Sequence, residues 1–237
     1  MTKKVLGIIP ARGGSKGVKR KNIRTVAGQP LIYWSIKSAK ESNVLDFCCV
    51  NTDDDEIANV AAEYGSDVIM RPPELAQDET PMLPVLQYVC EQAEAKFGKF
   101  DTIVLLQPTA PMREAKDIQG AVEAFHINCE SRSLVSVYQV DDCHPSRMYR
   151  IENGTLCKIF AEPQGSLRQD LEPIYHRNGA LYICERDLLM KKNLLICEHP
   201  IPYVMSKANS ANIDDEEDLF IADKLMQRKY NLDESPN

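Results

Sequence analysis

Short hydrophobic runs alternate with amphipathic stretches along the first 140 residues of the chain. Apolar runs of this kind, rich in Val and Ile, predict buried strands over residues 4–9, 47–51, 67–70, 102–106 and 134–139. The stretches between them predict helices over 30–41, from Thr52 onward, over 82–97 and up to about Cys129. Strands separated by helices in this way predict parallel β-α-β units. The expected fold class is therefore α/β, with a doubly wound, mostly parallel sheet.

Two of the predicted helices begin with residues suited to a helix start. Pro30 has no amide hydrogen to lose and is expected in the first turn of its helix. Thr52 is expected to cap the next helix, with the acidic residues 53–56 in its first turn, where the helix dipole favours negative charge.

Between residues 141 and 175 the alternation of strands and helices is interrupted. Residues 148–160 predict a hairpin that turns at Asn153-Gly154, a pair that tolerates the positive φ angles of tight turns. Strands are expected again over 179–185 and 203–205, and a last helix over 215–229. An extended insertion in a compact α/β domain needs a surface to pack against, and a second subunit is a reasonable candidate.

The composition is that of an ordinary globular protein, with 43% hydrophobic and 27% charged residues among 237. The net charge of −7 argues against a nucleic-acid-binding or membrane-binding protein, and no apolar stretch approaches the roughly 18 residues that cross a bilayer. The apolar run near the start meets Pro10 and Arg12, so we expect a strand rather than an export signal, and a cytoplasmic location. The eight cysteines contain no C-x-x-C pair and are expected to be reduced thiols rather than disulfides or a zinc site.

A basic, glycine-rich segment follows the first predicted strand. Residues 12–24 gather six cations in an otherwise acidic chain: Arg12, Lys16, Lys19, Arg20, Lys21 and Arg24. Gly13, Gly14 and Gly17 are expected to let the backbone approach a ligand and point N–H groups toward it. Because ligands of open α/β sheets bind beyond the carboxyl ends of the strands, the segment predicts a polyphosphate site. It matches neither a P-loop nor a dinucleotide fingerprint, and the alternative is a solvated basic loop.

The chain resembles the acylneuraminate cytidylyltransferases, also called CMP-sialic acid synthetases, in several motifs. The basic segment carries the first of them, Ile9-Pro10-Ala11-Arg12-Gly13-Gly14-Ser15-Lys16-Gly17 followed by Lys21-Asn22. Further motifs agree in order and spacing, at residues 51–54, 71–76, 106–109, 168–170, 178–182 and 213–214. The resemblance covers nearly the whole chain.

The resemblance implies one nucleotidyltransferase domain of Rossmann type over residues 1–237, with 141–175 as an inserted dimerisation segment of a homodimer. The implied activity joins CMP from CTP, with Mg²⁺, to the anomeric hydroxyl of an acidic nine-carbon nonulosonic acid of sialic or legionaminic type, and releases pyrophosphate. Two alternatives stay open. One is a CMP-Kdo synthetase, which acts on an eight-carbon sugar, and the other is a non-catalytic nucleotide-binding regulator on the same scaffold.

The predicted CTP site consists of Ala11, Arg12, Gly13, Gly14, Ser15, Lys16, Lys21, Asn22, Arg71 and Ala76. By the match, Arg12, Lys16 and Lys21 contact phosphate, and Lys16 is expected to stabilise the charge that develops at the α-phosphate. Asn22 and Arg71 match positions that hold the nucleotide. The loop that ends the Arg71 motif is expected to close on the cytosine.

The predicted sugar site consists of Gln107, Arg168, His176, Asn178 and Tyr182. An anionic sugar beside a triphosphate needs cations, and the planar fork of Arg168 suits a carboxylate. The alternatives are that Tyr182 only fills the core and that Gln107 only holds its own loop. Relatives often carry an arginine where this chain has His176. Arg177 follows one position later and is expected to point away, because neighbouring strand residues face opposite sides.

Asp214 is the predicted Mg²⁺ ligand and, directly or through a bound water, the general base. With Arg12 and Lys16 it makes up the predicted catalytic set. The family usually carries Asp-x-Asp here, whereas this chain has Asn212-Ile213-Asp214. The amide oxygen of Asn212 still suits a hard cation but carries no charge. The second possibility is that Asp215 turns in as a ligand.

Overall fold

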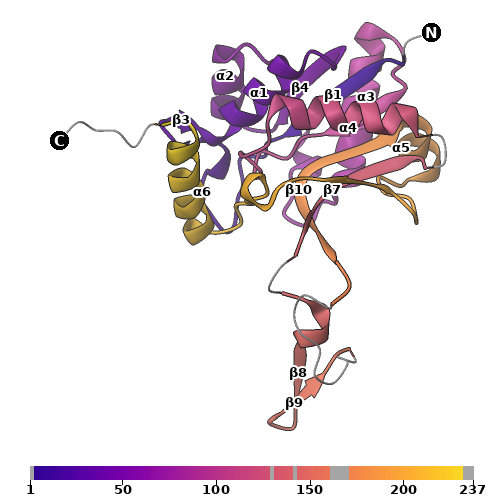
Figure 1. The fold of residues 1–237 in the computed structure, drawn as a ribbon. Coiled ribbons are helices and arrows are strands. Elements are labelled where there is room, and N and C mark those ends of the chain that lie inside the picture. Colours follow the sequence, from indigo (N-terminus) through magenta and orange to yellow (C-terminus); the bar gives the residue numbers. More distant parts are fainter. Residues whose placement is uncertain (1–2, 129–130, 141–142, 161–170, 232–237) are drawn as a thin grey trace.

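The computed structural model describes residues 3–128, 131–140, 143–160 and 171–231. Its centre is a seven-stranded sheet in the order β11-β7-β10-β6-β1-β4-β5 (Figure 1). The strands are β1 (Val5–Pro10), β4 (Phe47–Thr52), β5 (Asp67–Met70), β6 (Thr102–Leu105), β7 (Ser133–Gln139), β10 (Tyr175–Glu185) and β11 (Ile201–Val204). Strand β10 runs antiparallel to both of its neighbours, and the other pairs are parallel. The sheet is therefore mostly parallel, as predicted.

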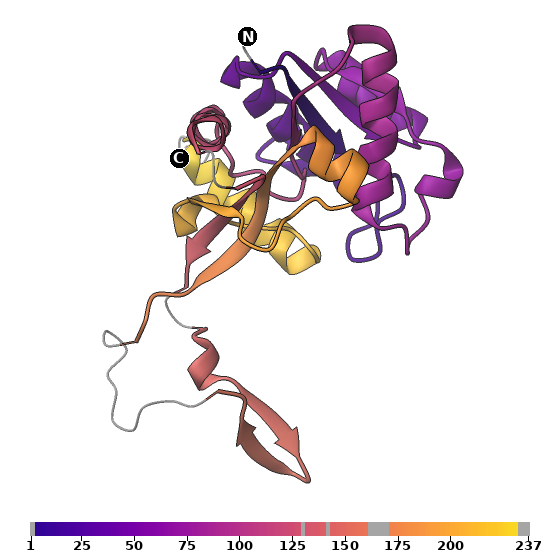
Figure 2. The same cartoon turned by 90° about the vertical axis from the view of Figure 1, so that its right-hand side faces the viewer.

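Helices cover both faces of this sheet (Figures 1 and 2). One face carries α1 (Leu31–Ser42), α2 (Asp55–Glu63) and α4 (Ala115–Ile127), and the other carries α3 (Met82–Phe97) and α5 (Arg186–Lys192). The alternation of side chains along β1 supplies both cores. Val5 and Ile9 pack with the first set of helices, whereas Leu6 and Ile8 pack with the second. This is the doubly wound arrangement expected from the sequence.

The last helix, α6 (Glu216–Lys229), packs beside the main body rather than on the sheet. Its Leu219 and Met226 share a buried cluster with Trp34 of α1 and with the short strand β2 (Thr25–Val26), which pairs with β3 (Gln29–Pro30). The segment just before α6 is fixed by Ile213, which is fully buried and whose amide donates to the carbonyl of Thr109 at 2.9 Å. The packing of α6 therefore brings residues 212–214 to the loop that follows β6.

The boundaries of the elements follow the sequence predictions, with a few differences. Asp54, not Thr52, caps α2, because its carboxylate accepts from two amides of the first turn while Thr52 still belongs to β4. Pro30 is the cap residue of α1 rather than part of its first turn. Strand β10 begins at Tyr175, because three residues ahead of its bend also pair with β7. Helix α5 was not predicted from the sequence, because its seven residues are too few for a helical period to be evident.

The strands β8 (Tyr149–Glu152) and β9 (Thr155–Lys158) form a hairpin that stands away from the sheet (Figures 1 and 2). Its turn has positive φ angles at Asn153 and Gly154, which confirms the predicted turn. Ile151 and Leu156 lie opposite each other on this hairpin and are 74% and 67% exposed. Within the predicted insertion, residues 141–142 and 161–170 lie outside the described residues.

The structure also bears on the cysteines, on a possible metal site and on a possible membrane-spanning helix. The described cysteines are free thiols at Cys48, Cys49, Cys90, Cys143, Cys157, Cys184 and Cys197. Among the described residues, no group of three or more His, Cys, Asp or Glu side chains could hold a metal ion. No helix in the described ranges is both long and apolar enough to cross a bilayer.

Candidate functional site

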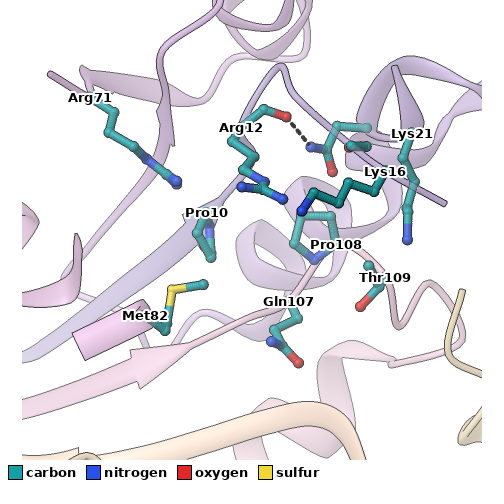
Figure 3. A pocket seen from close by; sticks show the side chains of 11 residues that line it. Pro10, Arg12, Lys16, Lys21, Arg71, Met82, Gln107, Pro108 and Thr109 are labelled. Atoms are coloured by element: carbon teal, nitrogen blue, oxygen red, sulfur yellow. Dashed lines mark hydrogen bonds between the residues drawn. The ribbon is translucent and has the colours of Figure 1, made fainter. Parts of the chain in front are cut away.

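A pocket of about 210 Å³ opens at the carboxyl ends of β1 and β6 (Figure 3). Because β1 lies between β4 and β6, the loops that leave β1 and β6 diverge here, and such a switch point is where open α/β sheets bind ligands. Several predicted residues line the pocket: Arg12, Ser15, Lys16, Lys21, Asn22, Arg71 and Gln107. Figure 3 shows four of their cationic side chains along one side and Gln107 across from them. The structure thus brings the predicted phosphate-binding residues and a predicted sugar-binding residue together.

Arg12 and Lys16 are both paired with Asp78, which follows the 3₁₀ helix η2 (Pro73–Leu75). One carboxylate oxygen of Asp78 lies 3.1 Å from the Arg12 guanidinium, and the other lies 3.2 Å from Lys16 Nζ. Arg12 also donates to the carbonyl of Gln77 at 3.0 Å. The Lys16 side chain is nevertheless 74% exposed, so it keeps the freedom to follow a ligand.

Arg71 reaches the pocket from the end of β5 and is only 6% exposed. Its Nε donates to Asn51 Oδ1 at 2.7 Å, and its terminal nitrogen donates to the Asn51 carbonyl at 3.1 Å. Burial lowers the pKa of Arg71 to about 10, and the charge of Asp53 opposes that shift. The side chain therefore stays positively charged at neutral pH, in an orientation that Asn51 sets.

The glycines of the basic loop approach the protein itself more closely than the sequence suggested. A Cβ at Gly13 would lie 2.7 Å from the Asp54 carboxylate, and one at Gly17 would lie 1.9 Å from the Asp214 carbonyl. The Gly13 amide donates to Asp53 at 3.0 Å, and the amide of Ala11 pairs with β4. The amides of Ala11 and Gly13 are therefore engaged by the protein in this structure, and the expectation that several amides of the loop point toward a ligand stays a prediction. Of the three loop glycines, only Gly14 has no described atom within 4 Å of the place that a Cβ would take.

Lys21 connects the basic loop to the segment before α6. Its Nζ donates to the carbonyls of Ile213 at 2.7 Å and Asp214 at 3.2 Å. Burial lowers the pKa of Lys21, and the charges of Asp214, Asp218 and Asp215 oppose the shift. The neighbouring Asn22 donates to the carbonyl of Arg12 at 2.9 Å and so holds the start of the loop (Figure 3). The predicted phosphate-binding and metal-binding segments are thus in direct contact.

Asn212 and Asp214 are joined side chain to side chain. The Asn212 amide nitrogen donates to Asp214 Oδ2 at 2.9 Å, while Asp218 accepts from the backbone amide of Asp214. Asp215 caps α6 and accepts from the Asp218 amide at 2.9 Å, so its carboxylate is engaged in the helix start. These residues suit a magnesium ion that one carboxylate shares with ligand phosphates, because Mg²⁺ keeps few protein ligands in such sites.

Gln107 follows β6 and faces the bend of β10. A Cβ at Gly179 would lie 2.9 Å from Gln107 Oε1 and 3.4 Å from Asn212 Oδ1, and Gly179 itself has a φ of +73°. A side chain at Gly179 would therefore displace the end of the Gln107 side chain, and the backbone conformation at Gly179 already favours glycine. The bend brings the predicted sugar-binding Gln107 close to the predicted metal-binding Asn212.

The predicted sugar-binding residue Asn178 is 3% exposed, and its amide is engaged by the protein. Its Oδ1 accepts from Ser136 Oγ at 2.6 Å and from the Ala180 amide at 3.1 Å. Its Nδ2 donates to Ser210 Oγ at 3.0 Å and to Met205 Sδ at 3.2 Å. In this structure Asn178 holds the bend of β10, and a direct contact with a sugar would require these bonds to break.

The other predicted sugar-binding residues of β10 lie outside the lining of the pocket. His176 is exposed and packs edge-on to Tyr138, with the ring centres 5.7 Å apart. Burial raises the pKa of Tyr182, whose side chain packs against the core formed with α3, and the charge of Arg177 opposes the shift. The pairing of β10 with β7 is irregular between Arg177 and Tyr182, so simple alternation does not determine which way Arg177 faces.

Ala76 closes the turn of η2, where its amide donates to the Pro73 carbonyl at 3.1 Å, and it does not line the pocket. Arg168 lies outside the described residues, so its predicted contact with the sugar carboxylate stays a prediction.

Sequence reasoning missed Asp78 and assigned Asp53 only to a helix start. Both follow strands whose carboxyl ends meet at this edge of the sheet, and that shared position is the signal that could have found them. Sequence reasoning also missed Arg113. This arginine is buried and donates to the carbonyl of Gln107 at 3.2 Å.

Comparisons with known proteins show which sequences and folds this chain resembles. Residues 6–230 match the family model described as cytidylyltransferase. The CMP-N,N'-diacetyllegionaminic acid synthase of Legionella pneumophila is 34% identical over 233 residues, which cover 94% of this chain and 97% of that protein. The N-acylneuraminate cytidylyltransferase of Escherichia coli O18:K1:H7 is 29% identical over 97% of this chain, but the match spans only 54% of that longer protein.

A solved structure gives the same fold at lower sequence similarity. It is that of CMP:2-keto-3-deoxy-manno-octonic acid synthetase complexed with CTP. It superposes with a TM-score of 0.73 at 17% identity and covers 95% of this chain and 99% of its own.

Proposed function

Because the chain belongs to the cytidylyltransferase family, we propose that it joins CMP from CTP to the anomeric hydroxyl of a nine-carbon nonulosonic acid of sialic or legionaminic type. The observation that carries the proposal is the pocket at the switch point of the sheet. Arg12, Lys16, Lys21 and Arg71 line it in a chain whose net charge is −7, and Gln107 lies across from them. A cationic pocket in an anionic protein favours a polyphosphate ligand.

The reaction requires charge stabilisation more than covalent chemistry from the protein. The anomeric oxygen of the sugar attacks the α-phosphorus of CTP, the bond from that phosphorus to the oxygen bridging to the β-phosphate breaks, and pyrophosphate leaves. Arg12, Lys16 and Lys21 are positioned to hold the phosphates and to stabilise the negative charge that develops on them. Lys16 has the most exposed side chain of the three and is assigned the transition-state contact.

The proton of the attacking hydroxyl needs an acceptor. Asp214 is the proposed base, directly or through a water, because Asn212 holds its carboxylate and Lys21 ties its backbone to the basic loop. Asp214, with Asn212 beside it, is also the proposed protein ligand of a magnesium ion shared with the phosphates. When bound, that ion would supply charge neutralisation and make the sugar hydroxyl more acidic.

The acceptor is proposed to lie between Gln107 and the bend of β10. Gln107 can donate and accept hydrogen bonds with sugar hydroxyls, and Gly179 leaves room for its side chain. Arg168 remains the proposed partner of the sugar carboxylate. The sialic or legionaminic type is proposed because the motifs at residues 107 and 178–182 are those of the resemblance.

The hairpin β8–β9 is proposed to form part of a homodimer interface. Ile151 and Leu156 are 74% and 67% exposed on a hairpin that stands away from the body, and burying such side chains against a second copy is favourable. A cytoplasmic location is proposed as well. Its support is the set of free thiols among the described residues, since exposed and half-buried cysteines persist in a reducing compartment.

The decisive experiment measures pyrophosphate release by the purified protein with CTP and Mg²⁺ across a panel of acidic sugars. The panel contains N-acetylneuraminic acid, di-N-acetyllegionaminic acid, pseudaminic acid and Kdo. We expect CTP-dependent release with a nine-carbon acid of the sialic or legionaminic type, and the ratio of kcat/KM values identifies the preferred sugar.

Other outcomes discriminate among the alternatives. Release with Kdo alone would reject the nine-carbon assignment but keep the cytidylyltransferase. Tight binding of CTP without release for any sugar would reject catalysis and indicate a regulatory protein. ATP, GTP and UTP in place of CTP serve as matched controls for the donor, and we expect each to support little turnover.

A further inference from the structure

Arg113 is a buried arginine without an acidic partner. It lies in the loop between β6 and α4 and is 3% exposed. One terminal nitrogen donates to the carbonyls of Ala180 at 2.7 Å and Gln107 at 3.2 Å, and the other donates to Ser35 Oγ at 2.7 Å. Its Nε is buried and has no hydrogen-bond partner. Within the described ranges no ion pair involves Arg113, so every acceptor it uses is neutral.

A guanidinium in this position is costly to bury. Transfer of a charge from water to the interior is strongly unfavourable unless it is paired, and here the hydrogen-bonded acceptors are neutral oxygens. The charge of Asp117 acts on Arg113 without an ion-pair contact and opposes the effect of burial only in part. Burial lowers the pKa of Arg113 to about 10, which leaves the group charged at neutral pH. A methionine or leucine would fill the same volume without that cost. The arginine therefore needs an explanation beyond core packing.

The contacts of Arg113 join three elements, and one of them, the loop that carries Gln107, lines the pocket. Gln107 belongs to the loop after β6, Ala180 follows the bend of β10, and Ser35 belongs to α1. The two carbonyls are bound by the same nitrogen, so their separation is fixed by one group. That separation governs how closely Gly179 approaches Gln107 Oε1, which a Cβ at Gly179 would meet at 2.9 Å.

We propose that Arg113 is a positioning residue for the acceptor sugar. It sets the distance between the Gln107 loop and the β10 bend, and its unpaired charge adds positive potential behind a site that takes an anionic sugar. This proposal rests on the proposed function, since it concerns the acceptor side of the same pocket. The phosphate side is held by a different set of contacts, those of Arg12, Lys16 and Asp78. The effect of Arg113 is therefore expected to be selective for the sugar.

The test compares Arg113→Lys and Arg113→Met with the wild type by steady-state kinetics in both substrates. Lysine keeps the charge but cannot bind two carbonyls and a hydroxyl with one planar group. We expect Arg113→Lys to raise KM for the sugar by at least about tenfold, the scale of a lost charge-assisted hydrogen bond. KM for CTP is expected to stay within about twofold. Arg113→Met, which also loses the charge, is expected to raise KM for the sugar further.

Two control variants separate positioning from stability. Arg186→Lys alters a different arginine, the first residue of α5, which pairs with Glu94, and we expect equal effects on the two KM values, if any. Gln107→Ala removes the group through which Arg113 acts, so adding Arg113→Lys to it is expected to raise KM for the sugar by less than about twofold more. Full additivity in that double variant would overturn the proposal, and so would equal changes of both KM values in a folded Arg113→Lys protein.

Amide hydrogen exchange tests the positioning role even if an Arg113 variant folds poorly or the wild-type protein shows no turnover. Ser35→Ala removes one acceptor of Arg113 without changing the arginine and is expected to speed amide hydrogen exchange in residues 107–110 and 178–181. Exchange in the basic loop is expected to stay as in the wild type. Unchanged exchange at both acceptor segments would overturn the positioning role independently of any activity, and so separates it from the proposed function.

Discussion

Lys16, which lines the pocket, has its Nζ 3.2 Å from a carboxylate oxygen of Asp78. The other oxygen of the same carboxylate lies 3.1 Å from the guanidinium of Arg12. Asp78 thus pairs with the two cations that are proposed to bind the triphosphate. A phosphate group has the same charge sign and oxygen donors as this carboxylate, so CTP has to displace it.

Replacing Asp78 by asparagine is therefore expected to tighten CTP binding. Partly exposed ion pairs of this kind are each worth about 0.2–1 kcal/mol, so breaking two of them costs CTP a factor of about 2–30 in affinity. We expect KM for CTP, and Kd from calorimetry, to fall by that factor in Asp78→Asn. Asp55→Asn, at an exposed residue of α2, is the control for the change in net charge. Weaker CTP binding in Asp78→Asn would show instead that the carboxylate supports the bound nucleotide.

The role assigned to Lys16 predicts a large and local loss. Lys16→Ala removes the charge proposed to act on the transferring phosphate, and we expect kcat to fall at least about 100-fold, the scale of losing one charge-stabilising group. Lys19→Ala removes the same charge three residues away, at an exposed side chain that does not line the pocket. We expect it to change kcat by less than about threefold, as a surface charge would. Equal losses in the two variants would mean that net charge, not contact, explains the effect.

The Asn212 amide donates to the Asp214 carboxylate at 2.9 Å. The position of that carboxylate therefore does not depend on a bound cation. Asn212→Asp would replace this bond by two carboxylates in contact, which repel each other unless a cation lies between them. We expect the variant to melt about 2–4 °C lower than the wild type in EDTA, for a loss of roughly 1 kcal/mol. Added MgCl₂ is expected to restore its Tm while leaving the wild type nearly unchanged. If added MgCl₂ did not change the Tm of the variant, that result would argue against a metal ion at this position.

The exposed pair on the β8–β9 hairpin predicts the oligomeric state. Light scattering at micromolar concentration is expected to give the mass of a dimer for the wild type. Ile151→Glu combined with Leu156→Glu places charges where apolar contact is proposed and is expected to weaken association by at least about 100-fold, as for loss of two anchors in an interface. Leu194→Glu, at a 47% exposed residue of the main body, is the matched control. A monomeric wild type would refute the proposed interface.

Local patterns in the sequence determined the elements and the location of the site. The alternation in β1 sends Val5 and Ile9 to one core and Leu6 and Ile8 to the other, and this period is a property of the strand itself. The turn at Asn153-Gly154 was predictable for the same reason, because positive φ angles are a local demand. The cations follow β1, so the general rule on carboxyl ends was enough to place them at the pocket.

Only the tertiary structure decided how the residues of the site engage one another. The pairing of Asp78 with Lys16, the contact of Gly17 with Asp214, and the bonds of Arg113 to Gln107 and Ala180 link segments far apart in the chain. Such contacts depend on strand order, on the irregular pairing of β10 and on the packing of α6, none of which leaves a periodic signal. For that reason the sequence alone identified which residues carry charge, while the fold determined which of those charges are already paired and which side chains only support the pocket.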